Sequence, residues 1–157
     1  MRTAAILALL LLVMGLLAPP VRASDAGSLD SQRLQPVTVV TKNGNQTFAV
    51  EFANTPTQRA RGLMFKTRLP ERQGMLFDFG VEREIQMWMK NTLIPLDMIF
   101  IQSDGRIHRI EQHTKPGSLR VISSNGPVRA VLEVTAGASK KYGIAPGDRV
   151  IHQLFSQ

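Results

Sequence analysis

The densest group of polar and aromatic side chains in the sequence lies between residues 88 and 97. Its members are Trp88, Lys90, Asn91, Thr92 and Asp97. Residues 90–92 are expected to form a loop between two strands, and loops on a rigid β scaffold often carry binding groups. An indole can stack on a ligand, amide and hydroxyl groups can orient it, and a carboxylate can hold a hydroxyl or an amine. The pattern predicts a small aromatic-polar pocket that binds a ligand. A structural interpretation stays open, in which Asp97 accepts hydrogen bonds from loop amides and Asn91 shapes the turn.

A second carboxyl group, that of Glu133, lies within the apolar segment 128–135. Together with Asp97 it would supply the acid and base of a hydrolase or lyase, provided that one environment raises a pKa. Nothing in the sequence places the two residues together. The chain has no cysteine, which excludes thiol catalysis, and it lacks the sequence signatures of serine hydrolases, zinc proteases, P-loop proteins and dinucleotide-binding proteins. We therefore favour a binding or interaction module over an enzyme, and we expect no cofactor.

Methionine offers a third kind of chemistry. The methionines near the predicted strands are Met64, Met75, Met87, Met89 and Met98. Thioethers are soft ligands that suit Cu(I), so Cu(I) binding is the third hypothesis. Methionine also fills irregular cores, and these residues alternate along the strands as core positions do. The sequence therefore predicts no metal site.

The segment 59–72 is strongly basic. It contains Arg59, Arg61, Lys66, Arg68 and Arg72, and Glu71 is its only acidic residue. Such a segment can bind phosphate or carboxylate groups. A run of charges is more often a solvated face, and both interpretations stay open.

The first 23 residues have the three parts of a secretory signal peptide. Met1-Arg2 gives a positive start, an apolar run extends from Ala4 to Ala18, and Val21-Arg22-Ala23 offers a small-residue cleavage site. The run is shorter than the roughly 20 apolar residues that span a bilayer, which favours cleavage over a retained anchor. No cysteine follows it, as a lipoprotein would require. We expect a periplasmic or secreted protein with no membrane span after signal cleavage.

Export also limits the partners. Without Arg2 and Arg22 the chain has 17 basic and 12 acidic residues, a net charge of +5. This moderate bias favours anionic surfaces such as lipid headgroups or acidic polymers. No nucleic-acid motif is present, and nucleic acid is not expected as a partner. The expected partner is a small molecule or a polymer of the cell envelope.

Residues 24–35 are polar and aperiodic and are predicted to be a flexible lead, followed by one β-rich domain over 36–157. Asn43-Gly44 predicts a hairpin between strands 37–42 and 46–52, and Thr55 is placed to cap a helix that begins at Pro56. Further strands are predicted over 75–79, 85–89, 96–102, 106–112, 119–123, 128–135 and 149–155, with a one-turn helix over 138–142. Strand 96–102 is apolar on both faces and should be central. The fold class is mostly β, a compact β-sandwich or barrel-like single domain with one or two short helices.

Four ordered motifs carry a resemblance to a known family. They are Gly62-Leu63-Met64-Phe65, Gly74-Met75-Leu76-Phe77, the segment 87–92 with Pro95-Leu96-Asp97, and Gly143-Ile144 with Gly147-Asp148. The chain resembles the domain of unknown function 192 family over about residues 36–155. The resemblance implies a compact β-sandwich or barrel-like fold and no particular activity. Met87 stands where the family often has an aromatic residue, which keeps the position apolar.

Overall fold

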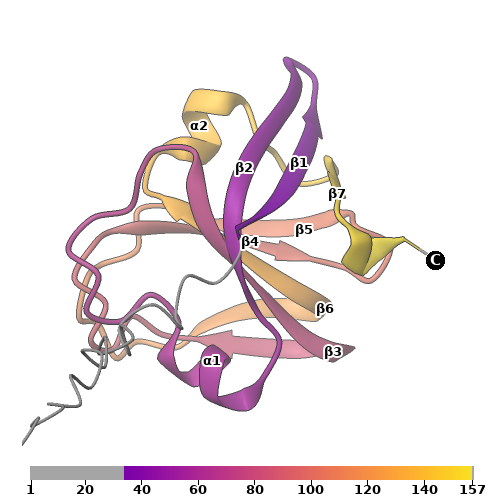
Figure 1. Ribbon diagram of the computed structural model, residues 1–157. Helices are drawn as coiled ribbons and strands as arrows, with labels where there is room; N and C mark the ends of the chain where they lie inside the picture. Colours follow the sequence, from indigo (N-terminus) through magenta and orange to yellow (C-terminus); the bar gives the residue numbers. More distant parts are fainter. Residues whose placement is uncertain (1–33, 157) are drawn as a thin grey trace, which may run out of the picture. The chain divides into compact units, whose positions relative to one another are not determined.

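A single curled β-sheet of seven strands forms a half-barrel with two short α-helices (Figure 1). The computed structural model describes residues 34–156, so the predicted signal peptide and residues 24–33 of the predicted lead lie outside the described residues. The elements are β1 (Gln35–Thr41), β2 (Gly44–Ala53), α1 (Pro56–Arg61), β3 (Gln73–Met87), β4 (Leu96–Ile101), β5 (Ile107–Glu111), β6 (Ile122–Thr135), α2 (Ala138–Tyr142), β7 (Arg149–Ile151) and a 3-10 helix (Gln153–Phe155). The prediction of a mostly β, barrel-like domain with short helices is confirmed. Within residues 34–156, no helix has the length and apolar content that crossing a membrane requires.

The strand order explains the barrel-like shape. The sheet runs β5-β4-β6-β3-β2-β1-β7, and every neighbouring pair is antiparallel except β2 and β3. The two edge strands meet at one end, where the amide of Ile107 donates to the carbonyl of Asp148 (2.9 Å) and the amide of Val150 donates to the carbonyl of Gly105 (2.8 Å). The curled sheet thus partly closes on itself, which covers part of both edges.

The first hairpin and the first helix form as local sequence chemistry predicts. Gly44 begins β2 with a positive φ of 98°, as the tight turn after β1 requires. Thr55 caps α1 by accepting a hydrogen bond from the amide of Gln58 (3.2 Å), and the Gln58 side chain accepts from the amide of Thr55 in return (3.1 Å). Helix α1 therefore has both halves of a capping box.

Two pairs of predicted short strands are single long strands in the structure. Strand β3 includes both 75–79 and 85–87, and β6 includes 122–123 together with 128–135. The turn signals at Gly80 and at Asn125-Gly126 mark interruptions of the β3–β6 register, which the ladder tolerates as bulges. Strand β3 ends at Met87, so Trp88 and Met89 lie beyond it, and the predicted strand 85–89 is two residues too long at this end. The predicted strand 149–155 is also shorter, because His152 caps the 3-10 helix through its ring.

The sheet has a buried core on each face. One core contains residues from all seven strands and from α2, and it includes Ile99 and Ile101. The other core covers the opposite face of β3, β4 and β6, and it includes Leu96, Met98 and Phe100. All six residues of β4 are buried, which confirms that this strand is central and covered on both faces. We refer to the two as the seven-strand core and the opposite core.

Candidate functional site

A cavity of about 190 Å³ lies on the opposite-core face of the sheet. Its lining comes from α1 and the segment that follows it, from β3, from the turn after β3, and from β6. The lining residues are Arg59, Ala60, Arg61, Gly62, Leu63, Met64, Phe77, Phe79, Gln86, Met87, Trp88, Thr92 and Glu133. We call this space the Trp88–Glu133 cavity. Its walls are mostly apolar, with aromatic rings among them, which is the usual character of a small-molecule site.

Glu133 is the only acidic residue of this lining. It lies opposite Met98 of β4 on one side and opposite Met75 of β3 on the other. Only 4% of the residue is exposed, and within residues 34–156 its carboxyl group has no hydrogen-bond or ion-pair partner. Burial in this apolar surrounding raises the pKa of Glu133 to about 8. At neutral pH the group is therefore mostly protonated and can donate a hydrogen bond to a bound molecule.

Two glycines allow close packing beside the cavity. A Cβ atom at Gly74 would lie 2.4 Å from the carbonyl oxygen of Glu133, so only glycine lets β3 approach β6 closely at this point. At Gly62, whose φ is 49°, a Cβ would lie 3.2 Å from the ring of Phe77. Three of the four sequence motifs thus meet here, because residues 62–64, Phe77 and the segment 87–92 all contribute to the lining.

The structure brings together two of the five predicted site residues. Trp88 lines the cavity and is 49% exposed, and Thr92 lines it and is buried. Lys90 and Asn91 are exposed at the turn and do not line the cavity. Asn91 has a φ of 56°, in agreement with the interpretation that it shapes the turn.

Asp97 lies apart from the other predicted site residues. It is fully buried, and its carboxylate accepts hydrogen bonds from the amides of His113 (2.9 Å), Gly137 (3.1 Å) and Ser139 (3.0 Å). Its directly opposite residue on β6 is Val134, a member of the seven-strand core. Asp97 therefore has the structural role that the sequence left open, and it fixes the loop before β6 and the start of α2.

The hypothesis of an acid/base pair between Asp97 and Glu133 is wrong. Directly opposite residues of an antiparallel pair share a face, and successive residues alternate between faces. Asp97 shares its face with Val134, whereas Glu133 shares the other face with Met98. The sheet separates the two carboxyl groups, and they cannot act on one substrate atom.

The five methionines singled out in the sequence all lie on the opposite-core side of the sheet, and Cu(I) binding through them stays a prediction. Met64 and Met87 line the cavity, whereas Met75, Met89 and Met98 are buried in the opposite core. The sulfur of Met89 accepts a hydrogen bond from the hydroxyl of Thr114 (3.2 Å). Among the described residues there is no cluster of three His, Asp or Glu side chains that could hold a metal ion.

The basic side chains of segment 59–72 lie apart: Arg59 and Arg61 line the cavity, whereas Lys66 and Arg72 contact other parts of the domain. Arg59 donates to the carbonyls of Asn54 and Asp78 (both 2.8 Å). Lys66 forms an ion pair with Glu51. Arg72 lies over the ring of Tyr142, 3.7 Å from its centroid.

Several cavity residues were not predicted as site residues. Leu63 and Phe77 were noted only in the motifs of the family resemblance, and Phe79 only within a predicted strand, because which face of a strand meets a cavity depends on the elements that cover it. The sequence did indicate Glu133, because a carboxyl group in an apolar strand is costly to bury unless it has a partner or a role. The sequence could not show that the partner was missing.

Comparisons with known proteins agree with this fold. The model of the family described as "Uncharacterized ACR", domain of unknown function 192, matches residues 38–152. A crystal structure from Sinorhizobium meliloti, described as a "putative transcription regulator", shares 46% identity over 74% of this chain and 91% of its own, with a TM-score of 0.72. A crystal structure of a protein of unknown function from Novosphingobium aromaticivorans shares 37% identity over 80% of this chain and 89% of its own, with a TM-score of 0.76. No curated protein matches the chain. The chain belongs to the domain of unknown function 192 family.

Proposed function

We propose that the domain binds a small, mostly apolar molecule in the Trp88–Glu133 cavity. The observation that carries this proposal is the carboxyl group of Glu133, which is buried at an apolar cavity without a partner among the described residues. Burying a polar group without a hydrogen bond costs free energy. A bound molecule that accepts a hydrogen bond from this group would remove that cost.

The size and chemistry of the cavity define the class of ligand. Its volume of about 190 Å³ is a little larger than that of an apolar cavity of about 150 Å³ that accommodates benzene. A ligand of one ring, or a short alkyl chain with one polar group, therefore fits. Because the Glu133 carboxyl is mostly protonated at neutral pH, the polar group should be a neutral acceptor such as an amide or ketone carbonyl.

Trp88 makes this proposal directly measurable. It is the only tryptophan of the chain and it lines the cavity. We expect hexanamide to change the Trp88 fluorescence at pH 6.5 with higher affinity than hexylamine or hexane of matched chain length. Above pH 8 the hexanamide affinity should fall, because an ionised carboxylate cannot donate a hydrogen bond.

Two substitutions of Glu133 separate hydrogen bonding from shape. Glu133→Gln keeps a donor and should bind hexanamide at every pH between 6 and 9. Glu133→Leu removes the donor and should lower the affinity by about tenfold, in line with the roughly 1–1.5 kcal/mol of a net hydrogen bond. Equal binding of the three probes, unchanged in Glu133→Leu, would refute the role of Glu133. No fluorescence response to any member of a wider panel of alkyl and aryl amides and ketones would refute the cavity as a binding site.

We also propose that the domain acts outside the cytoplasm, on a small molecule or on an apolar group of a cell-envelope polymer. The apolar run before Pro19 and the small residues before Ser24 support export. The mass of the protein recovered from the periplasm or culture medium should correspond to a chain that begins at Ser24. Recovery of the uncleaved chain in the cytoplasm alone would refute export, and the cavity proposal would be unaffected.

A further inference from the structure

Three loops lie side by side at one end of the sheet. They are residues 62–72 between α1 and β3, residues 88–95 between β3 and β4, and residues 112–121 between β5 and β6. The amide of Phe65 donates to the carbonyl of Asn91 (2.9 Å), the amide of Met89 to that of Ser118 (3.0 Å), and the amide of Gly117 to that of Thr92 (3.0 Å). The central loop is thus hydrogen-bonded to both of the others.

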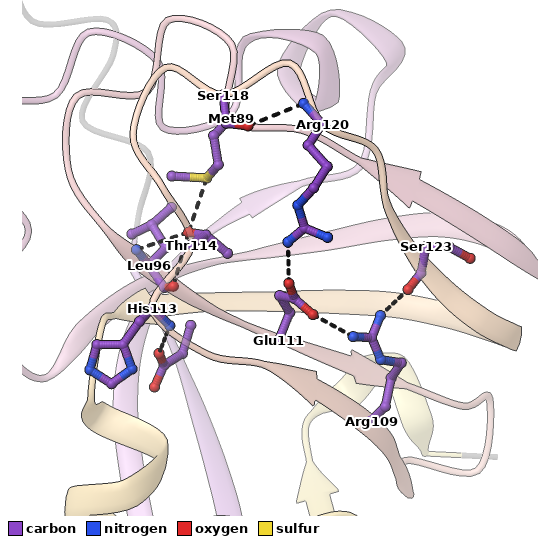
Figure 2. Close-up of polar contacts among 10 residues, drawn as sticks. Met89, Leu96, Arg109, Glu111, His113, Thr114, Ser118, Arg120 and Ser123 are labelled. Atoms are coloured by element: carbon purple, nitrogen blue, oxygen red, sulfur yellow. Dashed lines mark hydrogen bonds and ion pairs between the residues drawn. The ribbon is translucent and has the colours of Figure 1, made fainter.

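The third loop is also held to the body of the domain. Its Thr114 hydroxyl accepts a hydrogen bond from the amide of Leu96 (3.1 Å) and lies 3.2 Å from the sulfur of Met89. Figure 2 shows this contact together with Glu111, whose carboxylate lies between the guanidinium groups of Arg109 and Arg120. Exposed side chains on this loop are therefore presented from a fixed backbone.

These loops expose large apolar side chains to an unusual extent. Five of the nine large hydrophobic residues that are exposed in the described part of the chain belong to them: Phe65 (66%), Trp88 (49%), Leu93 (54%), Leu119 (72%) and Val121 (52%). Scattered exposed apolar residues are normal, whereas a concentration of them marks an interaction surface. We call this surface the loop face.

The loop face is predominantly basic. The three loops contain six lysine and arginine residues and one acidic residue, Glu71. Glu71 pairs with Lys141 and accepts a hydrogen bond from Tyr142 of α2. Among the basic residues, Lys66 pairs with Glu51 and Arg120 with Glu111. Lys90 and Lys115 are exposed, and neither has an ion-pair partner among the described residues.

We propose that the loop face docks onto an anionic lipid bilayer. Exposed tryptophan, phenylalanine and leucine enter the interfacial region of a bilayer, and lysine and arginine beside them bind anionic headgroups. A second copy of the chain does not suit this face, because two copies would bring like charges together. An acidic polymer would leave the apolar side chains without a role. The inference does not depend on the proposed ligand, although Trp88 belongs both to the loop face and to the cavity wall.

The test is sedimentation with vesicles, using the protein as recovered from the cells that express it. Vesicles of pure phosphatidylcholine are compared with vesicles that contain 30% phosphatidylglycerol, at low and at high salt. We expect binding to the anionic vesicles that weakens as salt screens the charges, with a blue shift of the Trp88 fluorescence. Wild type and variants carry the same N-terminus, so any effect of residues 1–33 on binding is common to all of them.

Matched variants separate the contribution of the loop face to vesicle binding from the contributions of net charge and of general hydrophobicity. Lys90→Glu with Lys115→Glu should lower the partition coefficient by about 25-fold or more, since each basic residue near an anionic surface contributes about fivefold. Lys42→Glu with Lys140→Glu makes the same change in net charge at exposed positions outside the three loops and should change binding by less than about threefold. Leu119→Ser should weaken binding more than Val81→Ser, whose side chain is similarly exposed at 67% on β3.

Several outcomes would overturn the proposal. One is wild-type protein that does not distinguish anionic from neutral vesicles. Another is equal loss of binding in the lysine pairs inside and outside the loops. Retention on polyglutamate beads without vesicle binding would assign the loop face to an acidic protein instead. Glu133→Leu should bind vesicles normally, so failure of the cavity proposal and failure of this one are distinguishable.

Discussion

Asp97 and Glu133 are buried carboxyl groups on neighbouring central strands, and their surroundings differ completely. Asp97 faces the seven-strand core and accepts hydrogen bonds from three backbone amides. Glu133 faces the opposite core, between Met75 and Met98, and has no such partner among the described residues. Backbone amides replace the hydrogen bonds to water that Asp97 loses on burial. No described residue offers such donors to Glu133, and burial raises its pKa to about 8, so that its carboxyl group is mostly protonated at neutral pH.

The comparison of the two carboxyl groups predicts that substitution of Asp97 causes the largest loss of stability. Asp97→Ala leaves three amide donors without an acceptor, and each unsatisfied buried group costs about 1–3 kcal/mol. We expect the free energy of unfolding to fall by about 5 kcal/mol in urea titrations. Asp97→Asn keeps one acceptor oxygen and should lose less. Glu133→Gln is the matched control on the other face and should change stability by about 1 kcal/mol or less. A similar loss in Glu133→Gln would show that Glu133 has structural partners of its own.

The pH dependence of stability gives the next largest effect. The unfolded chain loses the Glu133 proton near its ordinary pKa of 4.5, whereas the folded chain keeps it up to a pKa of about 8. Folding therefore takes up a proton between these pH values, and the free energy of unfolding falls as the pH rises through this range. The loss between pH 5 and pH 9 should be on the order of 4 kcal/mol.

Glu133→Gln supplies the control for this titration. His152 changes stability in the opposite direction, because partial burial lowers its pKa and its protonation at acidic pH is unfavourable in the folded chain. The difference between wild type and Glu133→Gln cancels this contribution and isolates Glu133. A difference that does not change between pH 5 and pH 9 would contradict the raised pKa.

Glycine substitutions beside the two carboxyl groups compare the packing of the two regions. Gly74→Ala would place a Cβ 2.4 Å from the carbonyl oxygen of Glu133, and we expect a loss of about 2–3 kcal/mol from overpacking. Gly137, whose amide donates to Asp97, has a φ of 86° but no atom closer than 3.6 Å to an added Cβ. Gly137→Ala should therefore lose only about 1 kcal/mol, the cost of the left-handed backbone. Equal losses would mean that β3 can move away from β6.

The contrast between the two carboxyl groups also explains what the sequence could predict. Local chemistry identified the hairpin at Asn43-Gly44, the capping box at Thr55 and the central position of residues 96–101, because each depends on neighbours in the chain. The β3–β6 pairing was not predictable in the same way. Gly80 and Asn125-Gly126 are typical of chain reversals, and only the long ladder between the two strands makes them bulges.

The same distinction between local and long-range contacts applies to the prediction of the site. Trp88 and Thr92 were identified from a local cluster, and they do line the cavity. Asp97 belonged to the same cluster in the sequence, but the pleat of β4 directs it to the other face, toward amides of residues 113, 137 and 139 that are distant in the chain. Glu133 was recognised as a carboxyl group in an apolar strand. Its lack of a partner is a property of β3, β4 and β6 together and has no signature in any one segment.

The smallest effect is expected at Ser139, beside Asp97. The amide of Ser139 donates to Asp97, whereas its hydroxyl is buried and has no hydrogen-bond partner among the described residues. Ser139→Ala keeps the amide contact and removes a polar atom that gains nothing in the folded chain. We expect stability to rise by about 0.5 kcal/mol, because the relief from burying an unpaired hydroxyl slightly exceeds the packing that is lost. Thermal unfolding would measure the change. A loss of 1 kcal/mol or more would mean that the hydroxyl has a partner after all, and the contrast with the unpaired carboxyl group of Glu133 would then extend to every polar side-chain atom beside Asp97.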